Sequence, residues 1–242
     1  MLRRPGYLRI YASVFRYMTE WALRRQFFLW ILLAAPLIAW ILPGQTSVPF
    51  LPLAISCITY CGPAAFIAGW RCSSARDSLA DILFSTKAGK HSLILPEILL
   101  PMLAGALPAL GLAILWTADR GGFPWQLWVV IPFASLTAVS ITVLLEKYLN
   151  QTGYLLNTLA FMAQASTASW VLSPVFQLMI PHGYVLWTLR WIDGSGAAYH
   201  GDMYVFAAVI QGIGLILLTV RVLSDSGMNH SGLSHGFNKP LS

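Results

Sequence analysis

The chain carries very little charge for its length. Asp, Glu, Lys and Arg together make up 10% of its 242 residues, whereas apolar residues make up 57%. A soluble domain usually has about a quarter charged residues. So few charges cannot cover a surface that faces water, which excludes an ordinary soluble domain and predicts that lipid is the main solvent. No long polar stretch is present that would form a second folded domain.

Cysteine is also scarce, and three cysteines do not make a disulfide framework. Cys57 and Cys61 are four residues apart in an apolar run, so they would share one face of a helix. A soft metal would accept such a pair, but small packing residues are the commoner use of cysteine in helices, and we predict no metal site. The first six residues lack a short apolar core with a cleavage site, so no removable signal peptide is expected.

Long apolar runs are what the sequence has in quantity. A helix needs about 17–25 apolar residues to cross roughly 30 Å of hydrocarbon. The runs show no period-2 alternation, which favours helices over membrane strands. We therefore predict an all-α fold, with a transmembrane domain over 26–223 between an amphipathic segment at 1–25 and a polar cytoplasmic tail at 224–242. The six predicted spans are 26–42, 48–70, 93–117, 125–145, 154–176 and 203–223.

The placement of the basic residues predicts the orientation. If both ends are cytoplasmic, thirteen of the fifteen Lys and Arg residues lie on the inner side, and only Arg120 and Arg190 lie outside. Such an excess follows the positive-inside rule. The net charge of +6 is thus an orientation signal, and no nucleic-acid partner is expected, because no basic patch is interleaved with a polar fold. The expected location is the cell membrane, a bacterial inner membrane in particular.

The N-terminal segment 1–25 predicts a helix of a different kind. Apolar residues recur at spacings of three and four, and charged residues fall on the opposite face, as in a helix that lies in the headgroup layer. A soluble surface helix is the alternative. The apolar set is Leu8, Tyr11, Phe15, Met18 and Ala22, and the charged set is Arg9, Arg16, Glu20 and Arg24.

The stretch 177–192 is largely apolar but contains Pro181, Gly183 and Arg190. It predicts a re-entrant or interfacial hairpin on the outer side, shielded by protein because irregular backbone is not stable in lipid. A short seventh crossing is the alternative, and it would place the C-terminus outside.

The loop between the second and third predicted spans contains a short helix. Ser74 precedes Asp77 by three residues, and Ser78 precedes Asp81, which are two patterns that begin helices. Gly89 is positioned to end the helix, with Lys87 close to that end.

This short helix has an apolar stripe, formed by Leu79, Ile82 and Leu83, with Phe84 beside it. A helix of this length is not stable alone, so something must bury the stripe. The chain's own helices or lipid would do so, and so would the groove of a partner protein. The sequence leaves these possibilities open.

In this layout the chain resembles the permease subunits of ABC transporters of the type-2 exporter class. Those subunits have an amphipathic N-terminal helix, six spans, both ends inside, and a coupling helix between spans two and three; many have short re-entrant helices between spans five and six. Residues 76–87 stand in the place of the coupling helix. The family's usual glycine and proline within that segment are absent, and Asp81 and Thr86 occupy roughly those places.

The resemblance implies partners and a role. Two permease subunits, the same chain or a homologous one, would pair in the lipid with two ATP-binding cassette ATPases that bind ATP and Mg. The chain itself would bind no cofactor and would export an amphipathic or hydrophobic substrate such as a drug, a peptide or a lipid-linked molecule. The residues implied in coupling are Arg76, Asp77, Leu79, Asp81, Ile82, Leu83, Phe84 and Lys87.

The chain has no phosphate-binding loop of its own. The nearest match is Gly89-Lys90, but Phe84 stands where the first glycine should be and His91 where Ser or Thr should be. We therefore expect it not to be an enzyme. Glu97, an acid inside a predicted span, is a candidate functional residue, with a structural role as the alternative. An ion-coupled secondary transporter is the second hypothesis, and a membrane-embedded enzyme, which would need a catalytic cluster, is the third.

Overall fold

The computed structural model describes residues 5–24, 50–71, 73–84, 91–118, 124–149, 178, 181–194 and 199–226. Over these residues the chain forms seven helices and no strand, which confirms the all-α prediction for this part of the chain. The helices are α1 (Pro5–Arg24), α3 (Phe50–Arg71), α4 (Ser74–Phe84), α5 (His91–Thr117), α6 (Trp125–Leu149), α9 (Pro181–Ile192) and α10 (Gly201–Ser226).

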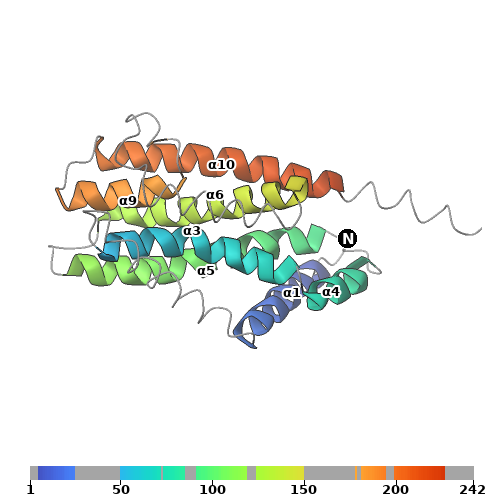
Figure 1. Ribbon diagram of the computed structural model, residues 1–242. Coiled ribbons are helices and arrows are strands. Elements are labelled where there is room, and N and C mark those ends of the chain that lie inside the picture. Colours follow the sequence, from blue (N-terminus) through green and yellow to red (C-terminus); the bar gives the residue numbers. More distant parts are fainter. Residues whose placement is uncertain are drawn as a thin grey trace, which may run out of the picture.

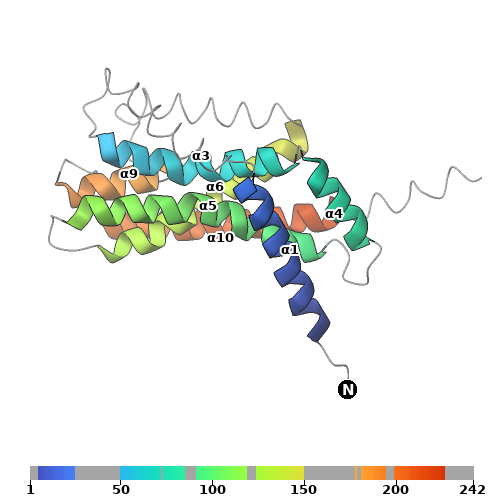
Figure 2. The ribbon, with the colours of Figure 1, turned by 90° about the horizontal axis from the view of Figure 1, so that it is seen from below.

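Four long helices, α3, α5, α6 and α10, lie side by side along a common direction (Figures 1 and 2). Helices α3, α6 and α10 run one way, and α5 runs the other way. We call the end where α3, α6 and α10 finish the basic end, because Arg71, Lys147 and Arg221 lie in or near their last turns. Helices α1 and α4 lie across this end of the bundle, whereas α9 packs near the opposite end.

Three of these helices are long and apolar enough to cross a membrane: α5 over Ser92–Thr117, α6 over Trp125–Leu149 and α10 over Gly201–Ser224. They match the spans predicted at 93–117, 125–145 and 203–223. The segment predicted at 48–70 is helix α3. The segments predicted at 26–42 and 154–176, and the tail after residue 226, lie outside the described residues, so the count of six spans stays a prediction.

Small residues let the long helices approach closely. Gly105 of α5 faces α3, where the ring of Pro63 occupies the space that a larger side chain would need. Ala134 and Ala138 of α6 are fully buried, and the neighbouring Ser135 donates a hydrogen bond of 3.1 Å to the carbonyl oxygen of Thr59 in α3. Close backbone approach through small residues is the usual packing of helices in lipid.

Gly105 supplies a direct test of this contact. A Cβ added there would lie 2.5 Å from Cδ of Pro63 and 2.9 Å from the carbonyl oxygen of Thr59. We expect Gly105→Ala to destabilise the protein by about 1–3 kcal/mol, the usual cost of overpacking. Thermal unfolding in detergent would measure it. Gly111→Ala on the same helix is the control, since its added Cβ meets nothing within 4 Å. Equal melting temperatures of the two variants would contradict the close approach.

Helix α1 has the predicted amphipathic character, but its apolar face packs on the protein itself. Met18 and Ala22 are buried together with Val14, against residues of α3 and α5. Leu8, which was assigned to this face, is exposed. On the opposite face, Arg16 donates a 2.8 Å hydrogen bond to Glu20. This bond, and then the charge of Arg16, lower the pKa of the Glu20 carboxyl.

Helix α9 falls within the stretch predicted to be re-entrant. It is in contact with α3, α6 and α10, and its Tyr184, Val185 and Leu189 are fully buried. These contacts shield α9 with protein, and the hairpin over 177–192 stays a prediction. Whether it enters the membrane from the outer side stays a prediction.

Candidate functional site

Helix α4 begins where the sequence predicted, at Ser74, but the residue before it supplies the cap. The side-chain oxygen of Ser73 lies 3.4 Å from the backbone amide of Arg76 and itself donates to the carbonyl oxygen of Trp70 at 2.7 Å. A serine oxygen on an orphan amide is the standard start of a helix. Because Ser73 also bonds to the last turn of α3, the cap fixes α4 relative to α3. Ser78 lies inside the helix and does not begin it.

The apolar stripe of α4 is divided between the protein and its surroundings. Leu83 is only 5% exposed and belongs to the same cluster as Val14 and Met18 of α1. Leu79 is half-buried at the edge of that cluster. Ile82 is 62% exposed. All three residues line a groove between α4 and α1. Leu83 lies at its buried floor and anchors α4 to the chain's own core, whereas Ile82 lies at its open edge.

The exposed side of α4 combines one apolar residue with acids and hydroxyls. Asp77, Asp81 and Ile82 are all exposed, as are the side chains of Ser74 and Ser78. Three of the residues implied in coupling are thus accessible to a partner. The Phe84 side chain and Lys87 lie outside the described residues, as does Gly89.

Four charged residues form a cluster where α4 meets the long helices. One of them is Arg76 of α4, and Glu97 of α5 is at the centre. Oε1 of Glu97 accepts a hydrogen bond of 3.1 Å from the indole nitrogen of Trp70 and one of 3.0 Å from Nε of Arg76. Nη2 of Arg71 lies 4.0 Å from the other carboxylate oxygen. The Glu97 side chain is 8% exposed, so the charge on this acid is balanced almost wholly by protein groups.

Glu146 of α6 completes the cluster. Its Oε2 lies 3.2 Å from Nη1 of Arg71, and both side chains are largely buried. Two carboxylates thus face two guanidinium groups, contributed by α3, α4, α5 and α6. We call Arg71, Arg76, Glu97 and Glu146 the charge cluster. It ties α4 directly to α5 through Arg76 and Glu97, and indirectly to α3 and α6 through Arg71 and Glu146, at the basic end.

The charge cluster is tightly balanced. A buried ion is costly unless it is paired, and removing one partner leaves the others uncompensated. Nη2 of Arg71 and Oε2 of Glu146 make no hydrogen bond, although each is near an opposite charge. In a low-dielectric interior, hydrogen bonds and ion pairs of one network strengthen one another. The position of α4 and the positions of α3, α5 and α6 are therefore energetically linked.

Glu97 and Arg76 were singled out from the sequence, but Arg71 and Glu146 were not. Arg71 was counted only as an orientation signal, and Glu146 fell one residue beyond the span predicted at 125–145. Helix α6 continues to Leu149 and so carries Glu146 inside. One signal in the sequence could have pointed to Glu146. It is an acid next to Lys147, at an end of a predicted span where basic residues otherwise gather.

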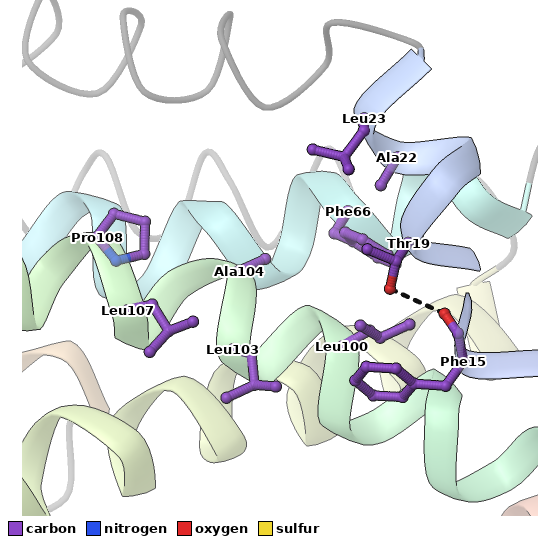
Figure 3. Close-up of a pocket in the computed structure, with 10 residues that line it drawn as sticks. All are labelled: Phe15, Thr19, Ala22, Leu23, Phe66, Leu100, Leu103, Ala104, Leu107 and Pro108. Atoms are coloured by element: carbon purple, nitrogen blue, oxygen red, sulfur yellow. Dashed lines mark hydrogen bonds between the residues drawn. The ribbon is translucent and has the colours of Figure 1, made fainter. Parts of the chain in front are cut away.

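An apolar pocket of about 380 Å³ lies beside the charge cluster, between α1, α3 and α5 (Figure 3). Leu23 of α1 and Leu107 of α5 are exposed at its rim. Its one polar side chain, Thr19, donates a hydrogen bond of 2.8 Å to the carbonyl oxygen of Phe15. The pocket has the size of a small-ligand site but offers hydrocarbon contact alone.

Metal-binding groups are not brought together in the described part of the chain, where no three His, Cys, Asp or Glu residues form a cluster. Cys57 is buried within α3 and packs in the main core, next to Cys61. Comparison with family models, with curated proteins and with solved structures gave no match.

Proposed function

We propose that this chain is the membrane-spanning permease subunit of an ATP-driven exporter, and that α4 is the helix through which a separate ATPase subunit acts on it. The observation that carries the proposal is the charge cluster. It joins α4, whose outer side is exposed, to α3, α5 and α6 by ion pairs and hydrogen bonds. A displacement of α4 would therefore be passed to α5 through the pair of Arg76 and Glu97, and from there to α3 and α6 through Arg71.

The division of the α4 stripe supports the same role. A helix that transmits motion needs one face fixed to the moving body and another face open to the motor. Leu83 provides the first, since it is buried against α1. Ile82 provides the second, since it is 62% exposed on a helix that also exposes Asp77 and Asp81. Exposed apolar residues ringed by polar ones are typical of protein interaction sites.

In the proposed mechanism, two copies of this permease, or this chain and a homologous one, pair with two ATPases. Closure of the ATPases on ATP and Mg binds one arrangement of α4 more tightly than the other, and this difference in binding shifts the population of the transporter between two states. The spans then open a path outward for an amphipathic or hydrophobic substrate. Both termini lie in the cytoplasm in this scheme.

The charge cluster favours this proposal over an ion-coupled transporter. A carboxylate that carries protons or ions must release them and be accessible during transport. Glu97 and Glu146 are instead each close to arginine, and Glu97 accepts two hydrogen bonds. Such pairing suits a permanent mechanical link between helices.

Co-purification tests the proposal. We expect the tagged protein, extracted in mild detergent from the cells that produce it naturally, to bring down an ATPase with a phosphate-binding loop in near-equal amount. The recovered complex should hydrolyse ATP. An unrelated six-span protein with the same tag is the control. If the tagged chain transports its substrate after reconstitution without any ATPase, the proposal is wrong.

A further inference from the structure

The pocket between α1, α3 and α5 is shaped to take hydrocarbon. It follows α5 from Leu100 to Pro108, which is about 12 Å of helix at 1.5 Å per residue. Within it, the Thr19 hydroxyl already donates a hydrogen bond to the carbonyl oxygen of Phe15. A ligand in this pocket gains nothing from hydrogen bonds, so the part that enters must be apolar.

The position of the pocket on α5 indicates that membrane lipid supplies the hydrocarbon. Helix α5 is a candidate membrane span, and Leu107 on it is 61% exposed beside the pocket. An exposed leucine on a spanning helix faces lipid tails. The pocket also begins one turn beyond Glu97, at the end of α5 where charged residues gather. It therefore extends from the interface inward, as an acyl chain does.

The charge beside the pocket is positive. Arg24 follows Leu23, which lines the rim, and its side chain is 83% exposed. Glu20 lies 2.8 Å from Arg16 but 4.0 Å from Arg24. Among the described residues, Arg24 therefore has no close ion pair. A basic residue at the membrane surface attracts anionic headgroups.

We propose that this pocket holds one acyl chain of an anionic phospholipid, whose phosphate group lies beside Arg24. The lipid would fill the space between α1 and α5 and hold α1 against the bundle. This inference rests on insertion of α5 in a membrane and does not depend on an ATPase partner. The lipid site can therefore be wrong while the proposed function is right, and the proposed function can be wrong while the lipid site is right.

Photolabelling in vesicles tests this proposal. The full-length protein is reconstituted in phosphatidylglycerol and phosphatidylcholine, with a trace of phosphatidylglycerol that carries a diazirine in its acyl chain. We expect labelled peptides from the α1 residues Phe15–Leu23 and the α5 residues Leu100–Pro108. A phosphatidylcholine probe with the same chain should label them several-fold less.

Two variants separate the pocket from the general lipid surface. Ala104→Phe places a ring in the pocket and should abolish its labelling, whereas Gly214→Phe on α10, where an added Cβ meets nothing within 4 Å, should leave it unchanged. Arg24→Gln alters no packing and should reduce the preference for the anionic probe about five-fold, the factor for one basic residue near the surface.

Three results would overturn the inference. The first is pocket labelling no stronger than that of the exposed α10 face around Phe206 and Leu217. The second is an unchanged preference between the probes in Arg24→Gln. The third is a chain-to-chain cross-link through a photoreactive residue at position 107, which would assign the pocket to a second copy of this chain.

Discussion

Glu97→Gln should destabilise the protein by about 3–5 kcal/mol. The substitution keeps the size of the side chain but removes the central negative charge of the charge cluster, which leaves Arg71 and Arg76 with Glu146 alone. Breaking a buried ion pair by removing one partner has a cost of this order. Thermal or denaturant unfolding in detergent would measure the loss. Hydrogen exchange should rise in α4 more than in α10, because α4 is held by Arg76.

Two further variants make this result specific. Arg76→Gln combined with Glu97→Gln removes one charge of each sign. The double variant should therefore lose less free energy of unfolding than the two single variants lose together, with a coupling energy of about 0.5–3 kcal/mol. Glu20→Gln, which breaks the exposed ion pair with Arg16, should leave the melting temperature nearly unchanged. Additive losses in the double variant would show that the charge cluster does not act as a unit.

Ile82→Asp should abolish ATP hydrolysis stimulated by the permease, or reduce it at least ten-fold, while the protein still inserts and folds. Among the described side chains of α4, Ile82 is the exposed large apolar one. A charge there prevents burial of that site in a partner's groove, where truncation of a central apolar residue typically costs 2 kcal/mol or more. The measurement is ATPase activity of the complex reconstituted from purified subunits.

Tyr148→Asp is the matched control, since Tyr148 is similarly exposed at the basic end but lies on α6. It should retain most of the activity. Leu83→Asp should instead lower the stability of the protein, because Leu83 is buried in the cluster that includes α1. A charge there would disrupt the packing of α4 on α1. If the folded Ile82→Asp variant stimulates ATP hydrolysis as the unchanged protein does, α4 is not the surface that binds the ATPase.

The sequence predicted much of the helical framework because its signals are local. Continuous apolar runs predicted α5, α6 and α10 to within a few residues at each end. A serine with an acid three residues later predicted the start of α4 at Ser74, although the cap comes from Ser73. Both signals depend on neighbours in the chain, so neither needs knowledge of the tertiary structure.

The charge cluster could not be predicted in the same way. Arg71 and Glu146 are far apart in sequence, and their pairing depends on α3 and α6 finishing at the same place in the bundle. The division of the α4 stripe has the same origin. Leu79 and Leu83 are one turn apart and share a face, whereas Ile82 is turned by about 100° from Leu83. The apolar spacing in the sequence predicted that the stripe is buried by another surface. The structure shows that α1 contributes to the cluster that buries Leu83.

The contact of Gly105 with Pro63 has a consequence for how the bundle can move. It leaves no free space between α5 and α3 at that point, and these two helices form the most extensive helix contact of the described residues. Helices packed this closely do not slide past one another without repacking many side chains. A shift of α5 at Glu97 would therefore carry α3 with it, and the two helices would move as one body.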